Sequence, residues 1–111
     1  MRRTRKKNIS ISLKRFLRFA FKRYPFCQWC NRPLIRLPHA GNSTIATVDH
    51  IIPKSKGGNH LWDNLCISCV TCNQLKNNDL WDREWMYGPL DWEIVRLEEK
   101  SNYLLTHPNS V

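Results

Sequence analysis

The sequence predicts a small α+β domain in which two neighbouring strands are followed by a short helix. Three observations lead to this fold class. Residues 45–51 are apolar and β-branched, as in a strand, and residues 65–68 suit its partner. The loop between them carries Gly57-Gly58, which is a turn signal. Residues 70–78 then suit a helix, so the predicted order is strand, strand, helix.

A basic amphipathic helix is predicted before this core. From Ile9 to Tyr24 apolar side chains recur at helical spacing, and Pro25 ends the pattern. We expect the apolar face to pack on the core. The opposite face is expected to contact phosphates, although a solvated surface or a membrane surface also suits such a helix. The cations of that outer face are Lys14, Arg15, Arg18 and Lys22.

The remaining elements have less regular patterns. Residues 34–37 suit a short strand, and residues 91–105 suit a final helix before a tail of residues 106–111. Three tryptophans follow the core helix. A Trp-rich stretch in a small domain usually packs inside, although such rings can also stack on bases. We therefore expect these residues in the core: Trp81, Trp85 and Trp92.

The chain of 111 residues predicts a single domain with an uneven charge. Residues 1–48 hold twelve Lys or Arg and no acid (+12), whereas residues 49–111 hold six against nine acids (−3), and the two sum to +9. Residues 1–8 are expected to be a disordered basic arm on one domain over residues 9–105. A nucleic acid is the favoured polyanionic partner, and no apolar run is long enough to span a membrane.

Five cysteines are present, and four of them form two Cys-x-x-Cys pairs. Lys14 and Arg15 interrupt what would be the apolar segment of a secretory signal, so a reducing compartment is expected. There the spacing favours one structural Zn²⁺ over disulfides, and the ion would supply folding free energy to a small core. Cys66 leaves a competing Cys66-x-x-Cys69 pair open. On spacing alone the zinc ligands are therefore Cys27 and Cys30 with either Cys66 and Cys69 or Cys69 and Cys72.

A second group of polar residues lies between and beside the cysteine pairs. Asp49-His50 ends the first predicted strand, Asn64 precedes the second, and Asn73 stands near the start of the helix. Carboxylate and amide oxygens suit a hard divalent ion, and a histidine can take a proton from water. Taken singly, each could be structural, as a buried histidine, an ion pair, a turn or a helix cap. Together and in this order they favour phosphodiester hydrolysis.

Over residues 24–78 this pattern resembles the HNH nuclease family, in its zinc-stapled ββα-metal form with asparagine in the third signature position (an HNN-type variant). The resemblance implies that Asp49 and Asn73 ligate a catalytic divalent ion and that His50 activates water. It also implies that Asn64 bonds the backbone of the loop that positions His50. Cys72-Asn73 matches the family's helix-start motif, which favours Cys27, Cys30, Cys69 and Cys72 as the zinc ligands. Many members carry histidine where this chain has Asn73, and the harder amide oxygen favours Mg²⁺ or Mn²⁺ over Zn²⁺ or Ni²⁺.

The resemblance further implies a metal-dependent endonuclease that nicks or cuts DNA and leaves 5′-phosphate and 3′-hydroxyl ends, with RNA still open as a substrate. Phosphate contacts are expected from Lys54, Lys56 and Lys76, while His60 has no assigned role. Because the chain is short, a targeting or packaging protein is an expected partner; the oligomeric state is open. The alternative function is a non-catalytic zinc-stapled module that binds nucleic acid or protein.

The expected location is the cytoplasm of a bacterial or phage-infected cell. Import into an organelle is the lesser alternative, because the Arg-rich start without acids also fits a transit peptide. The apolar face of the first predicted helix continues almost to Cys27, which leaves little room for a segment that is removed.

Overall fold

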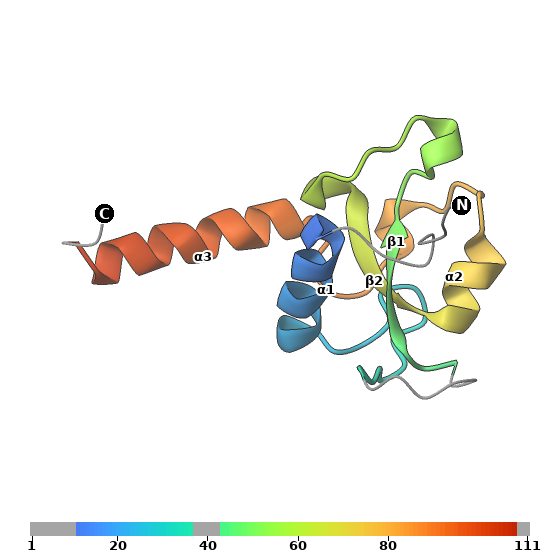
Figure 1. Cartoon of the computed structure of the whole chain (residues 1–111), viewed down its shortest axis with the longest axis horizontal. Helices are drawn as coiled ribbons and strands as arrows, with labels where there is room; N and C mark the ends of the chain where they lie inside the picture. The colour runs from blue at the N-terminus through green and yellow to red at the C-terminus, as the bar shows by residue number, and fades with distance from the viewer. Residues whose placement is uncertain (1–10, 37–42, 109–111) are drawn as a thin grey trace, which may run out of the picture.

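The computed structural model describes residues 11–36 and 43–108 of the chain, so the predicted arm of residues 1–8 lies outside them. Within the described residues the fold has three helices and a two-stranded sheet (Figure 1). Short 3₁₀ turns at residues 54–56, 62–64 and 83–85 connect these elements. In chain order the elements are α1 (Ile11–Arg23), β1 (Ala46–His50), β2 (Leu65–Cys69), α2 (Val70–Lys76) and α3 (Trp92–Thr106).

The two strands form an antiparallel hairpin. Ala46 pairs with Cys69 at one end of the ladder, and His50 pairs with Leu65 at the other. Helix α2 begins at the residue after β2, with Cys69 as its N-cap. The predicted order of strand, strand and helix is therefore confirmed, and His50 is the last residue of β1, as expected.

Helices α1 and α2 lie on opposite sides of the hairpin and contact both strands (Figure 1). Phe16 and Ala20 of α1 are completely buried, and Leu13 and Leu17 pack partly against the core. Burial of one phenylalanine side chain stabilises a fold by about 1.5–3 kcal/mol. The predicted apolar face of α1 is confirmed, and the cations of its outer face are exposed.

A buried glutamine ties the segment after α2 to the hairpin. Gln28 has no exposed surface. Its Oε1 accepts hydrogen bonds from Ile67 N at 3.1 Å and from Trp92 Nε1 at 2.7 Å. Its Nε2 donates to the carbonyls of Tyr87 at 3.0 Å and Pro89 at 2.7 Å. One side chain between the first two cysteines therefore satisfies four polar groups and anchors the start of α3.

Replacing Gln28 with leucine should lower the free energy of unfolding by about 3 kcal/mol or more, because buried donors and acceptors lose their partners. Urea titration measures the change. The matched control is Gln74→Leu on the exposed face of α2, which should change stability by less than about 0.5 kcal/mol. Equal shifts for the two variants would show that Gln28 does not anchor the segment.

Helix α3 starts in the core and then leaves it. Trp92 is completely buried, with its ring edge-to-face against Phe16 at 6.1 Å. From residue 96 onward α3 is exposed, and Figure 1 shows the helix projecting from the body. No helix in the described residues is both long and apolar enough to cross a membrane.

Two expectations for the fold are wrong. Trp85 is 62% exposed and lies outside the core, whereas Trp92 is buried and Trp81 is half-buried, with its ring 5.3 Å from that of Trp29. The strand expected at residues 34–37 is reduced, in its described part, to one bridge between Ile35 and Ile45. Residue pattern alone did not reveal these differences, because both depend on which surfaces the rest of the chain covers.

Candidate active site

The two cysteine pairs meet at the far end of the hairpin from His50. The sulfur atoms of Cys27, Cys30, Cys69 and Cys72 all lie within 4.8 Å of one another. Backbone N–H groups support two of them, because Trp29 N donates to Cys27 Sγ at 3.4 Å and Cys72 N to Cys69 Sγ at 3.3 Å. Cys66 is buried in β2 opposite Asp49 and is not in this group. The fold thus brings together the four cysteines that the family resemblance favoured.

These sulfurs fit a tetrahedral Zn²⁺ ion. Zn–S bonds of about 2.3 Å place tetrahedral sulfurs about 3.8 Å apart, which is compatible with sulfurs that all lie within 4.8 Å of one another. Burial raises the pKa of the Cys27 and Cys72 thiols. Thiolates at these positions therefore need a cation, and a closed four-thiolate site supplies folding free energy when it binds one.

The side chain of Asp49 is buried between β1 and α2. It is 5% exposed, its Oδ2 accepts a 2.9 Å bond from Trp29 Nε1, and its Oδ1 lies 3.6 Å from Lys76 Nζ. Burial raises the pKa of Asp49, and the Lys76 ammonium and Trp29 N–H oppose this rise. Trp29 was not expected here, because the indole and the carboxylate are far apart in the sequence.

The expectation that Lys76 contacts phosphate is wrong. Its side chain is completely buried, and Nζ donates a 2.7 Å bond to the carbonyl oxygen of His50. A phosphate contact needs an exposed ammonium group, but α2 packs Lys76 against β1. Lys76 instead connects the end of β1 to the carboxylate of Asp49.

Asn64 makes the bonds that were expected of it. It is 5% exposed, and its Oδ1 accepts from Ile52 N at 2.8 Å. Its Nδ2 donates to Ile52 O at 3.1 Å and to Asn59 O at 2.9 Å. The backbone of Gly58 packs so closely on Ile52 that a Cβ atom would lie 1.7 Å from Ile52 O. The loop after β1 is therefore held in one conformation.

His50 is the residue just before this loop, and its side chain is half-buried. The pKa of His50 is lowered to about 4, mainly by burial and to a lesser extent by His60, Lys54 and Lys76 nearby. The imidazole is therefore neutral at pH 7. Its Nε2 lies 2.7 Å from His60 Nδ1. His50 still belongs to the strand, and the chain bends at Ile51 and Ile52, directly after it.

Asn73 lies in α2 beside β1. Its Nδ2 donates to Thr47 Oγ1 at 3.0 Å and to Val48 O at 3.2 Å. Both bonds use the nitrogen, so the carboxamide oxygen is the atom that can serve as a metal ligand. Thr47 and Asp49 are two residues apart in β1, so both side chains lie on the side of the strand that faces α2.

Residues 27–79 match the family model described as HNH endonuclease. This segment is an HNH domain. The match covers both cysteine pairs, the hairpin and α2, and leaves α1 and α3 outside. No curated protein and no solved structure matched the chain. An HNH domain implies a nucleic acid as ligand or substrate, and the four-cysteine cluster of this one is compatible with zinc.

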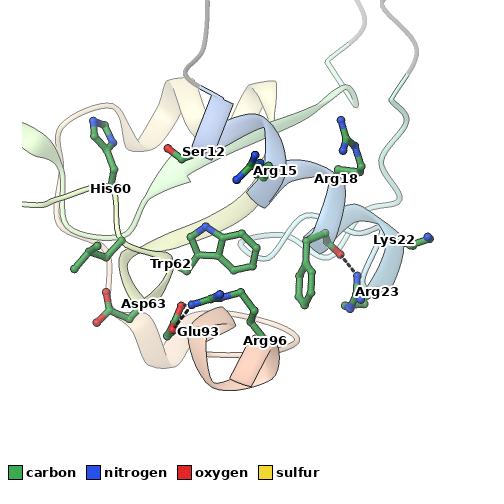
Figure 2. Close-up of a pocket in the computed structure, with 12 residues that line it drawn as sticks. Ser12, Arg15, Arg18, Lys22, Arg23, His60, Trp62, Asp63, Glu93 and Arg96 are labelled. Atoms are coloured by element: carbon green, nitrogen blue, oxygen red, sulfur yellow. Dashed lines mark hydrogen bonds and ion pairs between the residues drawn. The ribbon is translucent and has the colours of Figure 1, made fainter. Parts of the chain in front are cut away.

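A basic groove borders the HNH domain (Figure 2). It is lined by α1, by residues 60–63 and by the start of α3. Two of its cations are paired, Arg23 with Glu99 at 2.6 Å and Arg96 with Glu93 at 2.6 Å. Within residues 11–36 and 43–108 no acid pairs with the α1 cations of the groove, which are Arg15, Arg18 and Lys22. His60 lies at one end of the groove and contacts His50.

Proposed function

We propose that the HNH domain is a metal-dependent endonuclease that hydrolyses DNA phosphodiester bonds, by nicking or by double-strand cutting. The observation that carries this proposal is the state of His50. It ends β1 as a neutral imidazole, beside a loop that the buried Asn64 holds in place. A neutral, positioned imidazole is the side chain that most often takes a proton during hydrolysis.

His50 would act as the general base. It would take one proton from the water that attacks phosphorus and later release that proton to solvent. A pKa of about 4 makes a weak base in the free protein. A phosphodiester is an anion, however, and its approach would raise the pKa of His50 toward the working pH. Hydrolysis would leave 5′-phosphate and 3′-hydroxyl ends.

Asp49 and Asn73 would hold the catalytic ion, which we propose to be Mg²⁺ or Mn²⁺. The partner of Asp49 Oδ1 is Lys76 at 3.6 Å, beyond hydrogen-bonding distance, and Nδ2 rather than Oδ1 of Asn73 makes the bonds to β1. Both oxygens are hard donors that suit these ions. When bound, the ion would stabilise charge on the phosphate and on the departing oxygen. It would also take over the neutralisation of Asp49 that Lys76 now provides.

The basic face of α1 would bind the DNA backbone. It faces the groove that ends at His60, and the 3₁₀ turn at residues 54–56 adds two exposed lysines just after His50. Contacts of this kind position a duplex without reading its sequence, so binding would depend strongly on salt. A partner protein would then supply the targeting. The cations in question are Lys14, Arg15, Arg18, Lys22, Lys54 and Lys56.

Cleavage of supercoiled plasmid tests this function. The zinc-loaded protein should convert plasmid to nicked or linear forms with Mg²⁺ or Mn²⁺, and a chelator that removes only these ions should stop it. Activity with added Ni²⁺ or Zn²⁺ should be lower, because Asn73 offers an oxygen and not an imidazole nitrogen. Tight binding with intact plasmid under every metal condition would identify a binding module instead. A preference for Ni²⁺ or Zn²⁺ would exclude Asn73 as a ligand.

A further inference from the structure

His60 belongs to the loop that follows β1 and contacts His50 directly. The two imidazole rings have centroids 4.8 Å apart at an angle of 60°, and 2.7 Å separates His50 Nε2 from His60 Nδ1. Both atoms are ring nitrogens, so one must carry the proton of this hydrogen bond and the other must accept it. The contact therefore allows two combinations of tautomers for the two rings.

Only one of these pairs leaves His50 able to act as a base. If His50 Nε2 donates, His50 Nδ1 keeps a free lone pair that can take a proton. If His60 Nδ1 donates, a neutral His50 must carry its own proton on Nδ1. In that state Nδ1 of His50 carries a proton and Nε2 accepts the one from His60, so neither nitrogen can take a proton from water.

The same buried amide fixes the backbone beside both rings. Asn64 Nδ2 donates to Ile52 O, two residues after His50, and to Asn59 O, one residue before His60. Leu61 N, on the other side of His60, donates to Asn59 Oδ1 at 3.0 Å. The two imidazoles are therefore held at this separation by the chain on either side of them, and the contact is preorganised.

We propose that His60 is a positioning residue for the general base: it accepts the Nε2 proton of His50 and thereby fixes the ring and the tautomer in which His50 Nδ1 takes the proton of the attacking water. This inference rests on the proposed function of His50. His60, which accepts at Nδ1, carries its own proton on Nε2 in this arrangement. After the transfer His50 carries protons on both nitrogens and still donates to His60 through Nε2, so the orienting contact is kept.

Two substitutions of His60 test this role in the zinc-loaded protein. His60→Ala should lower kcat for plasmid cleavage by about 10- to 100-fold with little change in KM, the loss typical when the partner of a functional histidine is removed. His60→Asn should retain most of the activity, because its Oδ1 takes the place of Nδ1 and accepts the same proton. In a His50→Ala background, His60→Ala should have no further effect. His60 is exposed, so both variants should fold and keep their zinc.

The ¹⁵N resonances of the histidine side chains give a readout that needs no activity. At a pH where both rings are neutral, His50 should carry its proton on Nε2 with Nδ1 bare. A proton on His50 Nδ1 would overturn the inference. So would a His60→Ala variant that cleaves as fast as wild type, or one whose KM rises with kcat unchanged, which would show a direct phosphate contact. An inactive wild-type protein would instead remove the proposed function, and this role with it.

Discussion

Replacing Cys27 with serine should unfold the protein and release its zinc. The zinc ion would lose one of its four sulfur ligands. The small core around Phe16 and Trp92 has few other sources of stability. Structural zinc contributes an apparent binding free energy of about 10–16 kcal/mol in small domains, which is comparable to the whole stability of a domain. Circular dichroism and zinc content, measured on the same sample, report the change.

The matched control is Cys66→Ala. Cys66 is completely buried in β2, between the cysteine pairs in sequence, but is not part of the sulfur cluster. This variant should keep its zinc and lose only about 1–2 kcal/mol through the small cavity it creates. Removing zinc from the wild type with a strong chelator should reproduce the Cys27→Ser result. A folded Cys27→Ser protein with undiminished zinc would rule out the four-sulfur site as the source of stability.

His50→Ala should reduce plasmid cleavage by about 10²- to 10⁴-fold, the usual contribution of a general base, while the affinity for DNA stays the same. The wild-type rate should also fall when acid protonates His50. Since burial lowers its pKa to about 4, the acid limb of kcat/KM should lie near pH 4 and not near the ordinary histidine value of 6.5. Single-turnover rates across this range measure both effects.

The control for this substitution is His107→Ala, at the exposed end of α3, which should cleave as fast as wild type. Gel-shift measurements on the same preparations separate binding from cleavage. If His50→Ala and wild type cut plasmid equally, another base or a contaminating nuclease is responsible, and His50 has no catalytic role.

Local patterns were sufficient where the relevant contacts are set by the chain itself. The strand–strand–helix order follows from an apolar, β-branched run, a Gly-Gly turn signal and a helical stretch. The cysteine spacing predicted a zinc site, and the family resemblance chose the four cysteines whose sulfurs converge. The role of Asn64 followed from the family resemblance, and its bonds to Ile52 agree with it.

Contacts between residues far apart in the sequence could not be predicted. Lys76 was expected to contact phosphate, but the packing of α2 on β1 buries it beside Asp49. Gln28 is separated from Trp92 by 64 residues, and Trp29 from Asp49 by 20, so no local signal marks either bond. The contact of His60 with His50 depends on how the intervening loop folds back.

Diffraction from crystals of the zinc-loaded protein soaked in Mn²⁺ tests most directly whether the hairpin holds a structural and a catalytic metal. Anomalous scattering should place one zinc ion among the four sulfurs and one Mn²⁺ at bonding distance from Asp49 Oδ1 and Asn73 Oδ1, near the imidazole of His50. The absence of a zinc ion among the four sulfurs would contradict this arrangement. So would crystals in which no Mn²⁺ binds at Asn73 and Asp49 keeps Lys76 and Trp29 as its sole partners.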